Sequence, residues 1–281
     1  MKAILIVCDG LGDRPTKALN GLTPLQAAKA ETLDRIAAAG ECGIMDVIAP
    51  GQPPGSDTAH LALFGYDPYE CYPGRGAFEA LGVGIELKPA NVLLPRGAGN
   101  LPRIEPITRI WGVKAAAIAG GGLYKGVAKA VGFELIEVPG ATGTVNTNLR
   151  GKVEAALDAL DKYDLVFLHI KATDSVSHDK NPRKKVEVIE WISRELTPLV
   201  DKVFEEGYYL AITGDHTTPS EVGEHKGDPV PLAIIGPDVR RDEVDKFDEI
   251  SCARGCLCRI RGIDLMRILM NYLGRVPLFG E

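Results

Sequence analysis

Acidic and histidine side chains directly follow several apolar, strand-like stretches of this sequence. In an open α/β sheet, ligands bind at the edge where the carboxyl ends of the strands meet. We therefore expect side chains placed just beyond those ends to converge on a single crevice. In chain order they are Asp9 after the stretch 2–8, Asp174 and His178 after 164–170, and Asp215 and His216 after 208–213.

Three carboxylates and several imidazoles in one crevice would repel each other and lose hydration, so the arrangement requires cations, which divalent metal ions supply. Asp174 and His178 are four residues apart, which places both on one face of a helical turn. His225 follows nine residues after His216. We predict two ions, each with an open position for a substrate oxygen. The first predicted ligand set is Asp9, Asp215 and His216 for one ion, and the second is Asp174, His178 and His225 for the other.

Ser56, in the segment PPGSDTAHLALFG, is the candidate nucleophile and a further ligand of the ion held by Asp9, Asp215 and His216. Two prolines and a glycine precede it and a helical pattern follows, so Ser56 falls at a helix amino terminus, where backbone N–H groups favour a phosphoryl group. A simple helix-capping serine is the alternative. Two metal ions roughly 3.5–4 Å apart lower the pKa of a bound oxygen and hold both oxygens of an in-line displacement. Phosphoryl or sulfuryl transfer through a seryl intermediate is the reaction class that these residues favour.

Four further side chains each have more than one interpretation. His60, one helical turn beyond Ser56, is either a proton carrier or a histidine whose hydrogen bonds are satisfied within the helix. His169 lies inside a strand-like stretch. It is interpreted as a core group, as a support for the metal ligands or as a substrate contact. Arg75 in GRGAFEALG and Lys114 in WGVKAAAIAG are candidate partners of phosphate or carboxylate, or else ordinary surface ion pairs.

Short stretches rich in Ile, Val and Leu alternate with longer segments of helical period, which predicts an α/β fold with a mostly parallel sheet and helices on both faces. We expect a single domain over residues 1–281, with one irregular stretch at 88–106 that is a domain junction or a long loop. The expected strands are 2–8, 43–48, 115–119, 133–138, 164–170, 208–213 and 230–235, and the expected helices are 24–39, 122–131, 149–162, 183–206 and 262–273.

Composition excludes several classes of protein. The net charge of −6, with 45% hydrophobic and 25% charged residues, is ordinary for a globular protein and argues against disorder. The acidic balance argues against nucleic acid as the main partner. We also expect no membrane association, because no apolar run approaches the roughly 20 residues of a membrane span. The run RKK at 183–185 is interpreted as a solvated helix face.

Six cysteines occur in a chain that we expect to be cytoplasmic, so a disulfide framework is not predicted. Cys252, Cys256 and Cys258 form a cluster that either binds a soft metal or is a group of loop thiols. The sequence leaves the oligomeric state open.

Seven segments resemble the archaeal-type cofactor-independent (2,3-bisphosphoglycerate-independent) phosphoglycerate mutases of the alkaline phosphatase superfamily, over nearly the whole chain. The resemblance implies an alkaline phosphatase-like core, a Ser56 nucleophile, two Mn²⁺ or Zn²⁺ ions on the two ligand sets above, and phosphoglycerate as substrate. It also implies that Lys114 contacts phosphate. The segments are VCDGLGDRP, PGSDTAHLALFGYDP, GRGAFEALGVG, VKAAAIAGGGLYKGVAKAVG, GATGTVNTN, KATDSVSH and TGDHTTPSEVGEHKGDPVPL.

One departure from that family is large. Its members carry an inserted second domain between FEALGVGIELKP and ANVLLPRGAGN, and here the two segments join at Pro89 and Ala90. In that family the insertion closes over the substrate. A mutase must exclude water while the phosphoryl group is bound to the serine. The alternative function is therefore a capless metal-dependent phosphatase acting on small phosphate esters.

Three other interpretations compete. The segment AIAGGGLYKG follows a predicted strand and opens a helix, as in dinucleotide-binding folds, but its glycine spacing departs from GxGxxG at the last position. A catalytically silent metal-binding protein would carry the same ligands. A sulfatase would require a CxPxR-type context around the nucleophile, which Ser56 lacks.

Overall fold

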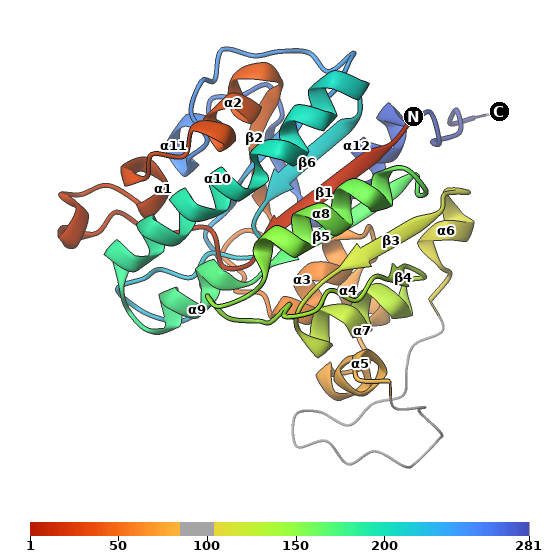
Figure 1. Cartoon of the computed structure of the whole chain (residues 1–281), viewed down its shortest axis with the longest axis horizontal. Helices are drawn as coiled ribbons and strands as arrows, with labels where there is room; N and C mark the ends of the chain where they lie inside the picture. The colour runs from red at the N-terminus through yellow and green to blue at the C-terminus, as the bar shows by residue number, and fades with distance from the viewer. Residues whose placement is uncertain (85–103, 281) are drawn as a thin grey trace.

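A single mixed sheet organises the chain. The computed structural model describes residues 1–84 and 104–280. Within that part the strands lie in the order β4-β3-β5-β1-β6-β7-β2-β8 (Figure 1). Strand β7 is antiparallel to β6 and β2, and the other described neighbours are parallel. The strands are β1 (Ala3–Cys8), β2 (Glu41–Asp46), β3 (Ala115–Ile118), β4 (Glu134–Leu135), β5 (Leu165–Ile170), β6 (Tyr209–Thr213), β7 (Val230–Ile235) and β8 (Cys258–Arg261). The predicted α/β fold with a mostly parallel sheet is confirmed.

The central strands are apolar along their whole length because both faces of the sheet are covered. Every residue of β1 and β5 is buried. Successive side chains of a strand point to opposite faces, and in β1 they enter two different core clusters. Ile4 and Ile6 pack in one cluster, and Leu5 and Val7 in the other.

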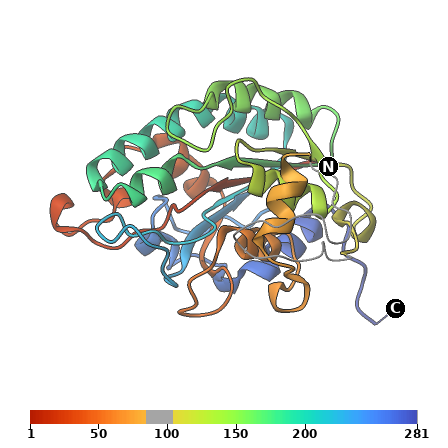
Figure 2. The same cartoon turned by 90° about the horizontal axis from the view of Figure 1, so that it is seen from below.

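Helices form one layer on each face, as Figure 2 shows, with α8 and α10 (green to teal) above the sheet and α3 (orange) and α12 (blue) below it. The helices whose apolar residues join the first cluster are α1 (Pro24–Ala27), α2 (Glu31–Ala39), α8 (Leu149–Leu160), α9 (Ala172–His178), α10 (Pro182–Glu206) and α11 (Glu249–Cys252). Those packed on the other face are α3 (Ser56–Leu63), α4 (Pro68–Cys71), α5 (Arg75–Gly82), α6 (Ile107–Ile110), α7 (Gly122–Ala130) and α12 (Gly262–Tyr272). A short 3-10 helix, η1, spans Lys17–Leu19.

The register of the central strands brings their carboxyl ends to one level. Cys8 pairs with Ile170, and Val7 pairs with Thr213. The backbone N–H of Asp9 continues this ladder by donating to the Ile170 carbonyl at 2.8 Å. The segments that follow β1, β5 and β6 therefore start side by side at one edge of the sheet.

The expected helix 24–39 is two helices, because tertiary contacts compete for the backbone between them. Helix α1 is a single turn closed by a capping box of Thr23 and Gln26. The backbone N–H of Lys29 donates to Glu190 at 2.9 Å, in helix α10. The helical spacing of apolar residues continues across this interruption, so the sequence pattern does not reveal it. The irregular stretch 88–106 lies outside the described residues except for 104–106.

The cysteine cluster does not form a metal site in the described part of the chain. Cys252 is buried, whereas Cys256 and Cys258 are exposed, and all are free thiols. Neither of the two groups of potential metal ligands found among the described residues contains a cysteine.

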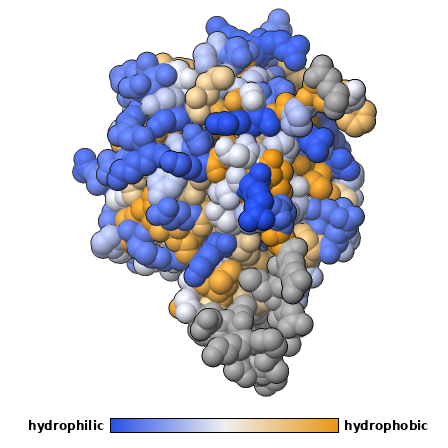
Figure 3. All heavy atoms as spheres, turned by 90° about the vertical axis from the view of Figure 1, so that its right-hand side faces the viewer, coloured by the Kyte–Doolittle hydropathy of each residue, from blue (hydrophilic) through white to orange (hydrophobic). Residues whose placement is uncertain are grey.

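Residues 1–84 and 104–280 contain no helix that is long and apolar enough to cross a membrane. Hydrophilic and hydrophobic side chains are interspersed over the face shown in Figure 3.

Lys185 contradicts the interpretation of residues 183–185 as a solvated face. Its side chain is fully buried, and its ammonium lies 3.0 Å from a carboxylate oxygen of Asp13. The same ammonium donates to the carbonyl oxygens of Gly10 at 2.8 Å, Gly12 at 3.0 Å and Thr218 at 3.1 Å. One side chain of α10 thus ties the loop after β1 to the loop after β6, and those loops carry four of the predicted metal ligands, Asp9, Asp215, His216 and His225.

Replacing Lys185 by methionine should lower the free energy of unfolding by about 3–5 kcal/mol, because Asp13 would be left buried without its cation. The adjacent Lys184 has a side chain that is 49% exposed and pairs with Glu187. Lys184→Met is therefore the matched control and should cost less than about 0.5 kcal/mol. Urea unfolding followed by circular dichroism measures both values, and equal losses would contradict the assignment of Lys185 to the interior.

Candidate metal centre

The first predicted ligand set comes together around the imidazole of His216. Its Nε2 atom lies 3.3 Å from Oδ1 of Asp9 and 3.4 Å from Oδ2 of Asp215. The Ser56 hydroxyl lies 3.4 Å from the same nitrogen. All four residues are buried. Residues that follow β1 and β6 and the first residue of α3, far apart in the sequence, therefore surround one point.

Three observations show that this set fits a divalent ion. Ligand atoms about 2.0–2.1 Å from a tetrahedral ion lie about 3.3–3.4 Å from one another, which matches these separations. Asp9 Oδ1 and Asp215 Oδ2 are buried and have no hydrogen-bond partner. His216 Nδ1 bonds to the Thr218 hydroxyl at 2.9 Å, which leaves Nε2 as the atom facing the carboxylates.

The electrostatics of this set also call for a cation. Burial and, to a smaller extent, the nearby charge of Asp9 together raise the pKa of Asp215 to about 7. Burial alone would raise the pKa of Asp9 too, but the charge of Lys171, a hydrogen bond from His169 and the nearby His216 imidazole hold it well below the ordinary value. Two adjacent buried carboxylates cannot both be charged at low cost without a positive partner.

The second predicted set, Asp174, His178 and His225, also comes together. Nε2 of His178 lies 3.3 Å from Asp174 Oδ2, and Nε2 of His225 lies 3.6 Å from Asp174 Oδ1. The Nδ1 atoms of the two histidines bond to backbone carbonyls, of Gly223 at 2.8 Å and Pro54 at 2.9 Å. A donating Nδ1–H leaves Nε2 as a lone-pair donor to a metal ion.

The two sets are neighbours. The rings of His216 and His225 stack with centroids 3.6 Å apart. Thr218 accepts the bond from His216 and donates its own proton to Asp174 at 3.1 Å. A single hydroxyl thus fixes the orientation of one side chain in each set.

Ser56 is the first residue of α3, as expected for a helix amino terminus. Gly55 occupies the N-cap position, and no side chain caps this helix. The capping alternative therefore does not account for the hydroxyl, which points instead to His216. Free N–H groups in the first turn of a helix favour an anionic group beside such a hydroxyl.

His60 and His169 are both buried next to the first set. His60 Nδ1 bonds to the Ser56 carbonyl at 2.6 Å, while its Nε2 has no partner. Burial lowers the pKa of His60 to about 3 and that of His169 to about 4, so both are neutral near pH 7. His169 Nε2 lies 3.1 Å from Asp9 Oδ2 and supports that ligand.

Lys171 was missed by the sequence reasoning. Its ammonium lies 2.7 Å from Asp174 Oδ2 and 3.4 Å from Asp9 Oδ2, so it touches one ligand of each set. Burial would lower the pKa of Lys171, but Asp9, Tyr124 and Asp174 raise it above the ordinary value. Its position directly after β5, in the segment KATD, was the available signal.

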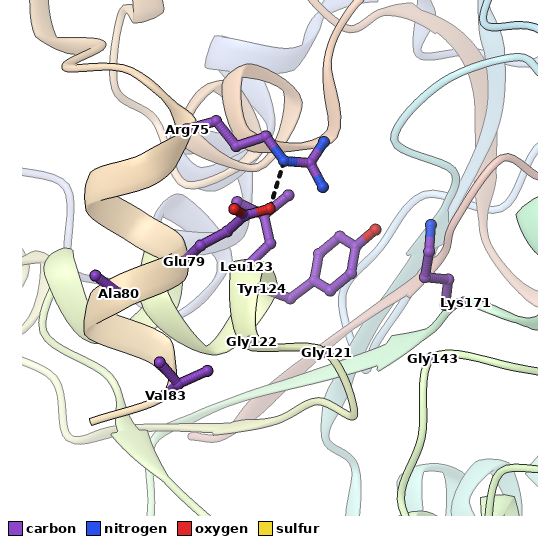
Figure 4. A pocket seen from close by; sticks show the side chains of 10 residues that line it. All are labelled: Arg75, Glu79, Ala80, Val83, Gly121, Gly122, Leu123, Tyr124, Gly143 and Lys171. Carbon is purple, nitrogen blue, oxygen red and sulfur yellow. Dashed lines mark hydrogen bonds and ion pairs between the residues drawn. The ribbon is translucent and has the colours of Figure 1, made fainter. Parts of the chain in front are cut away.

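A cavity of about 480 Å³ opens beside Lys171, between α5 and α7. Figure 4 shows the Tyr124 ring between Arg75 and Lys171. Arg75 lines this cavity and also pairs with Glu79 at 2.7 Å, so both of its predicted interpretations have a structural basis. The Tyr124 ring stacks on His169 with centroids 3.7 Å apart.

The glycines of AIAGGGLYKG have a packing explanation. A Cβ atom on Gly126 would overlap the Phe78 carbonyl, and one on Gly82 would overlap the Gly122 carbonyl. These glycines let α5 and α7 approach closely. This close approach, together with the failed GxGxxG spacing, accounts for the segment without a bound dinucleotide.

Lys114 does not lie with these residues, which corrects its expected position. It is exposed and directly precedes β3, at the amino end of a strand parallel to β5. Its backbone N–H bonds to Asp164, which directly precedes β5. The ligands follow the opposite, carboxyl ends of β1, β5 and β6. The predicted strand 115–119 already placed Lys114 at the wrong edge.

Comparison with known proteins identifies relatives. The chain matches the Metalloenzyme superfamily over residues 1–272. A 2,3-bisphosphoglycerate-independent phosphoglycerate mutase from Pyrococcus furiosus is 37% identical over 99% of both chains. The solved PH0037 protein from Pyrococcus horikoshii is 44% identical, with a TM-score of 0.95 over 100% of this chain and 98% of that one.

Alkaline phosphatase from the Antarctic bacterium TAB5 is 10% identical, with a TM-score of 0.58 over 98% of this chain and 99% of that one, and it shares the fold. The predicted alkaline phosphatase-like core is therefore confirmed. Identity to the mutase from Pyrococcus furiosus extends across practically the whole chain. The chain thus belongs to the Metalloenzyme superfamily and, within it, to the family of 2,3-bisphosphoglycerate-independent phosphoglycerate mutases.

Proposed function

We propose that this chain interconverts 2- and 3-phosphoglycerate by metal-dependent phosphoryl transfer, with a phosphoserine intermediate at Ser56. The observation that carries the proposal is the Ser56 hydroxyl 3.4 Å from His216 Nε2, beside two carboxylate oxygens that have no hydrogen-bond partner. A serine hydroxyl is a weak nucleophile by itself. Its placement among metal-type ligands supports a role in transfer rather than in folding.

The proposed cofactors are two divalent ions, Mn²⁺ or Zn²⁺. When bound, such ions lower the pKa of a hydroxyl and neutralise charge on phosphoryl oxygens. The proposed ligands are Asp9, Ser56, Asp215 and His216 for one ion, and Asp174, His178 and His225 for the other.

The chain's own residues would bind the substrate and hold the reacting groups in place. The first turn of α3 offers backbone N–H groups to the phosphoryl oxygens beside Ser56. Arg75, at the cavity, is the proposed partner of the glycerate carboxylate, because a guanidinium binds planar anions well. Neutral His60 and His169 hold Ser56 and Asp9 in place. We also expect the cytoplasmic location of an enzyme acting on a small glycolytic phosphate.

A second candidate function is a phosphatase, and one specific observation favours it. The alignment with the mutase from Pyrococcus furiosus spans 406 residues, whereas this chain has 281. The relative therefore has a substantial part without counterpart here, which we place at the junction 88–106. Without that part, water has easier access to a phosphorylated serine, and hydrolysis competes with return of the phosphoryl group.

Removing the metal should abolish activity, and adding Mn²⁺ or Zn²⁺ to the stripped protein should restore it. Asp174→Asn and His225→Ala should each reduce the metal content of the purified protein, because each removes a ligand of one ion. Elemental analysis measures this content, with exposed Lys184→Met as the control. Full metal content in both ligand variants would contradict the proposed second set.

Replacing Ser56 by alanine should remove the phosphoenzyme and lower turnover by about 10³-fold or more, as expected when a nucleophile is lost. Mass spectrometry of protein quenched in acid during turnover detects a phosphoserine. Thr58→Ala is the matched control, because the Thr58 hydroxyl lies in the same helix but bonds to the Gly55 carbonyl at 3.0 Å. Undiminished turnover in Ser56→Ala would rule out the seryl intermediate.

Incubation with 3-phosphoglycerate should yield both 2-phosphoglycerate and inorganic phosphate, because the open site lets water compete. Coupled assays measure the two products separately in one reaction. Efficient isomerisation without phosphate release would refute the open-site argument, and phosphate release alone would favour the phosphatase.

A further inference from the structure

We infer that Lys171 is a catalytic cation, which neutralises the ligand carboxylates in the ion-free protein and contacts the phosphoryl group of the bound substrate. The inference rests on the proposed function. It concerns a residue that belongs to neither ligand set and to which the sequence analysis assigns no role.

Lys171 touches both ligand sets at once. Its ammonium lies 2.7 Å from Asp174 Oδ2, the same oxygen that lies 3.3 Å from His178 Nε2. It also lies 3.4 Å from Asp9 Oδ2. A carboxylate oxygen bound to a divalent ion attracts an ammonium less, because the ion has already neutralised its charge. Lys171 and divalent ions therefore compete for the same carboxylates.

Lys171 can also reach a substrate. Its side chain is 26% exposed and lines the 480 Å³ cavity, where its ammonium lies 5.4 Å from the Tyr124 ring centroid. Figure 4 shows this side chain directed toward the tyrosine hydroxyl end of the cavity. An ammonium released from Asp9 and Asp174 thus has open space in which a phosphoryl oxygen can be placed.

The other cations near the site have partners outside the two ligand sets. Arg75, which also lines the cavity, pairs with Glu79 at 2.7 Å. Lys185 is fully buried against Asp13. Lys152 is fully buried and donates to the His169 carbonyl at 2.7 Å. Among the lysines and arginines described for this edge, Lys171 is the one that faces both the carboxylates and the cavity.

This arrangement predicts opposite changes in two measurable quantities. Removing the ammonium relieves competition, so ion-free protein should bind divalent ions more tightly. Removing it also takes away positive charge from the transferring phosphoryl group, so turnover should fall. A lysine that only maintains the fold would instead weaken ion binding when it is removed.

The experiment compares wild-type protein with Lys171→Met, Lys171→Arg and Lys184→Met after treatment with EDTA. Calorimetric titration with Mn²⁺ alone should show Lys171→Met binding about 3–10-fold more tightly than wild type, since it loses a competing charge at buried carboxylates. With saturating Mn²⁺ and 3-phosphoglycerate, its kcat should fall by about 10²-fold. Lys171→Arg should retain more of the kcat, and Lys184→Met should match wild type in both assays.

Weaker or unchanged Mn²⁺ binding in Lys171→Met would overturn the inference, and so would an unchanged kcat. If circular dichroism shows that Lys171→Met does not fold, Lys171→Gln takes its place under the same criteria. The outcome for the wild-type protein separates this inference from the proposed function. Wild type that neither binds Mn²⁺ nor turns over phosphoglycerate would defeat the proposed function itself. An active wild type with an equally active Lys171→Met would defeat only the role of Lys171.

Discussion

The carboxylates of Asp9, Asp174 and Asp215 are buried together at the edge of the sheet, each 1% exposed or less. Their mutual repulsion and lost hydration raise the pKa of Asp215 to about 7, with burial the larger cause. The imidazoles turn their Nε2 atoms toward these oxygens, and Lys171 brings an ammonium to two of them. The cluster is therefore built to receive positive charge, and the fold around it must supply the free energy that keeps the acids close.

That free energy comes from elements outside the cluster. Two helix layers and the buried strands bring the loops after β1, β5 and β6 to the same edge of the sheet. Lys185 then ties the first of these loops to the third through Asp13 and three carbonyl oxygens. On the other face, glycines in α5 and α7 let these helices pack closely, which brings Arg75 and Tyr124 to one cavity. The residues that position the loops and helices are thus different from the residues proposed to carry out the chemistry.

The chain keeps the fold shared with alkaline phosphatase and both ligand sets, in fewer residues than the alignment with the mutase spans. The metal-type ligands all lie after strands or on helices of this core, so they need no further domain to come together. Recognition of the organic part of the substrate is a separate matter. We propose that in this chain it falls to the cavity between α5 and α7, whose lining combines apolar side chains with Arg75 and Lys171.

The sequence by itself determined all the described strands except β8, the acids and histidines that follow them, and Ser56 at the start of a helix, because these depend on local period and on chain-breaking residues. It could not separate Lys184 from Lys185, adjacent residues of which one is exposed and the other fully buried. It also did not reveal Lys171, whose partners come from two different strand ends. Only the tertiary structure decided these, because burial of a charge depends on which distant oxygens the packed elements bring within reach. The local pattern of residue types does not indicate which distant atoms those are.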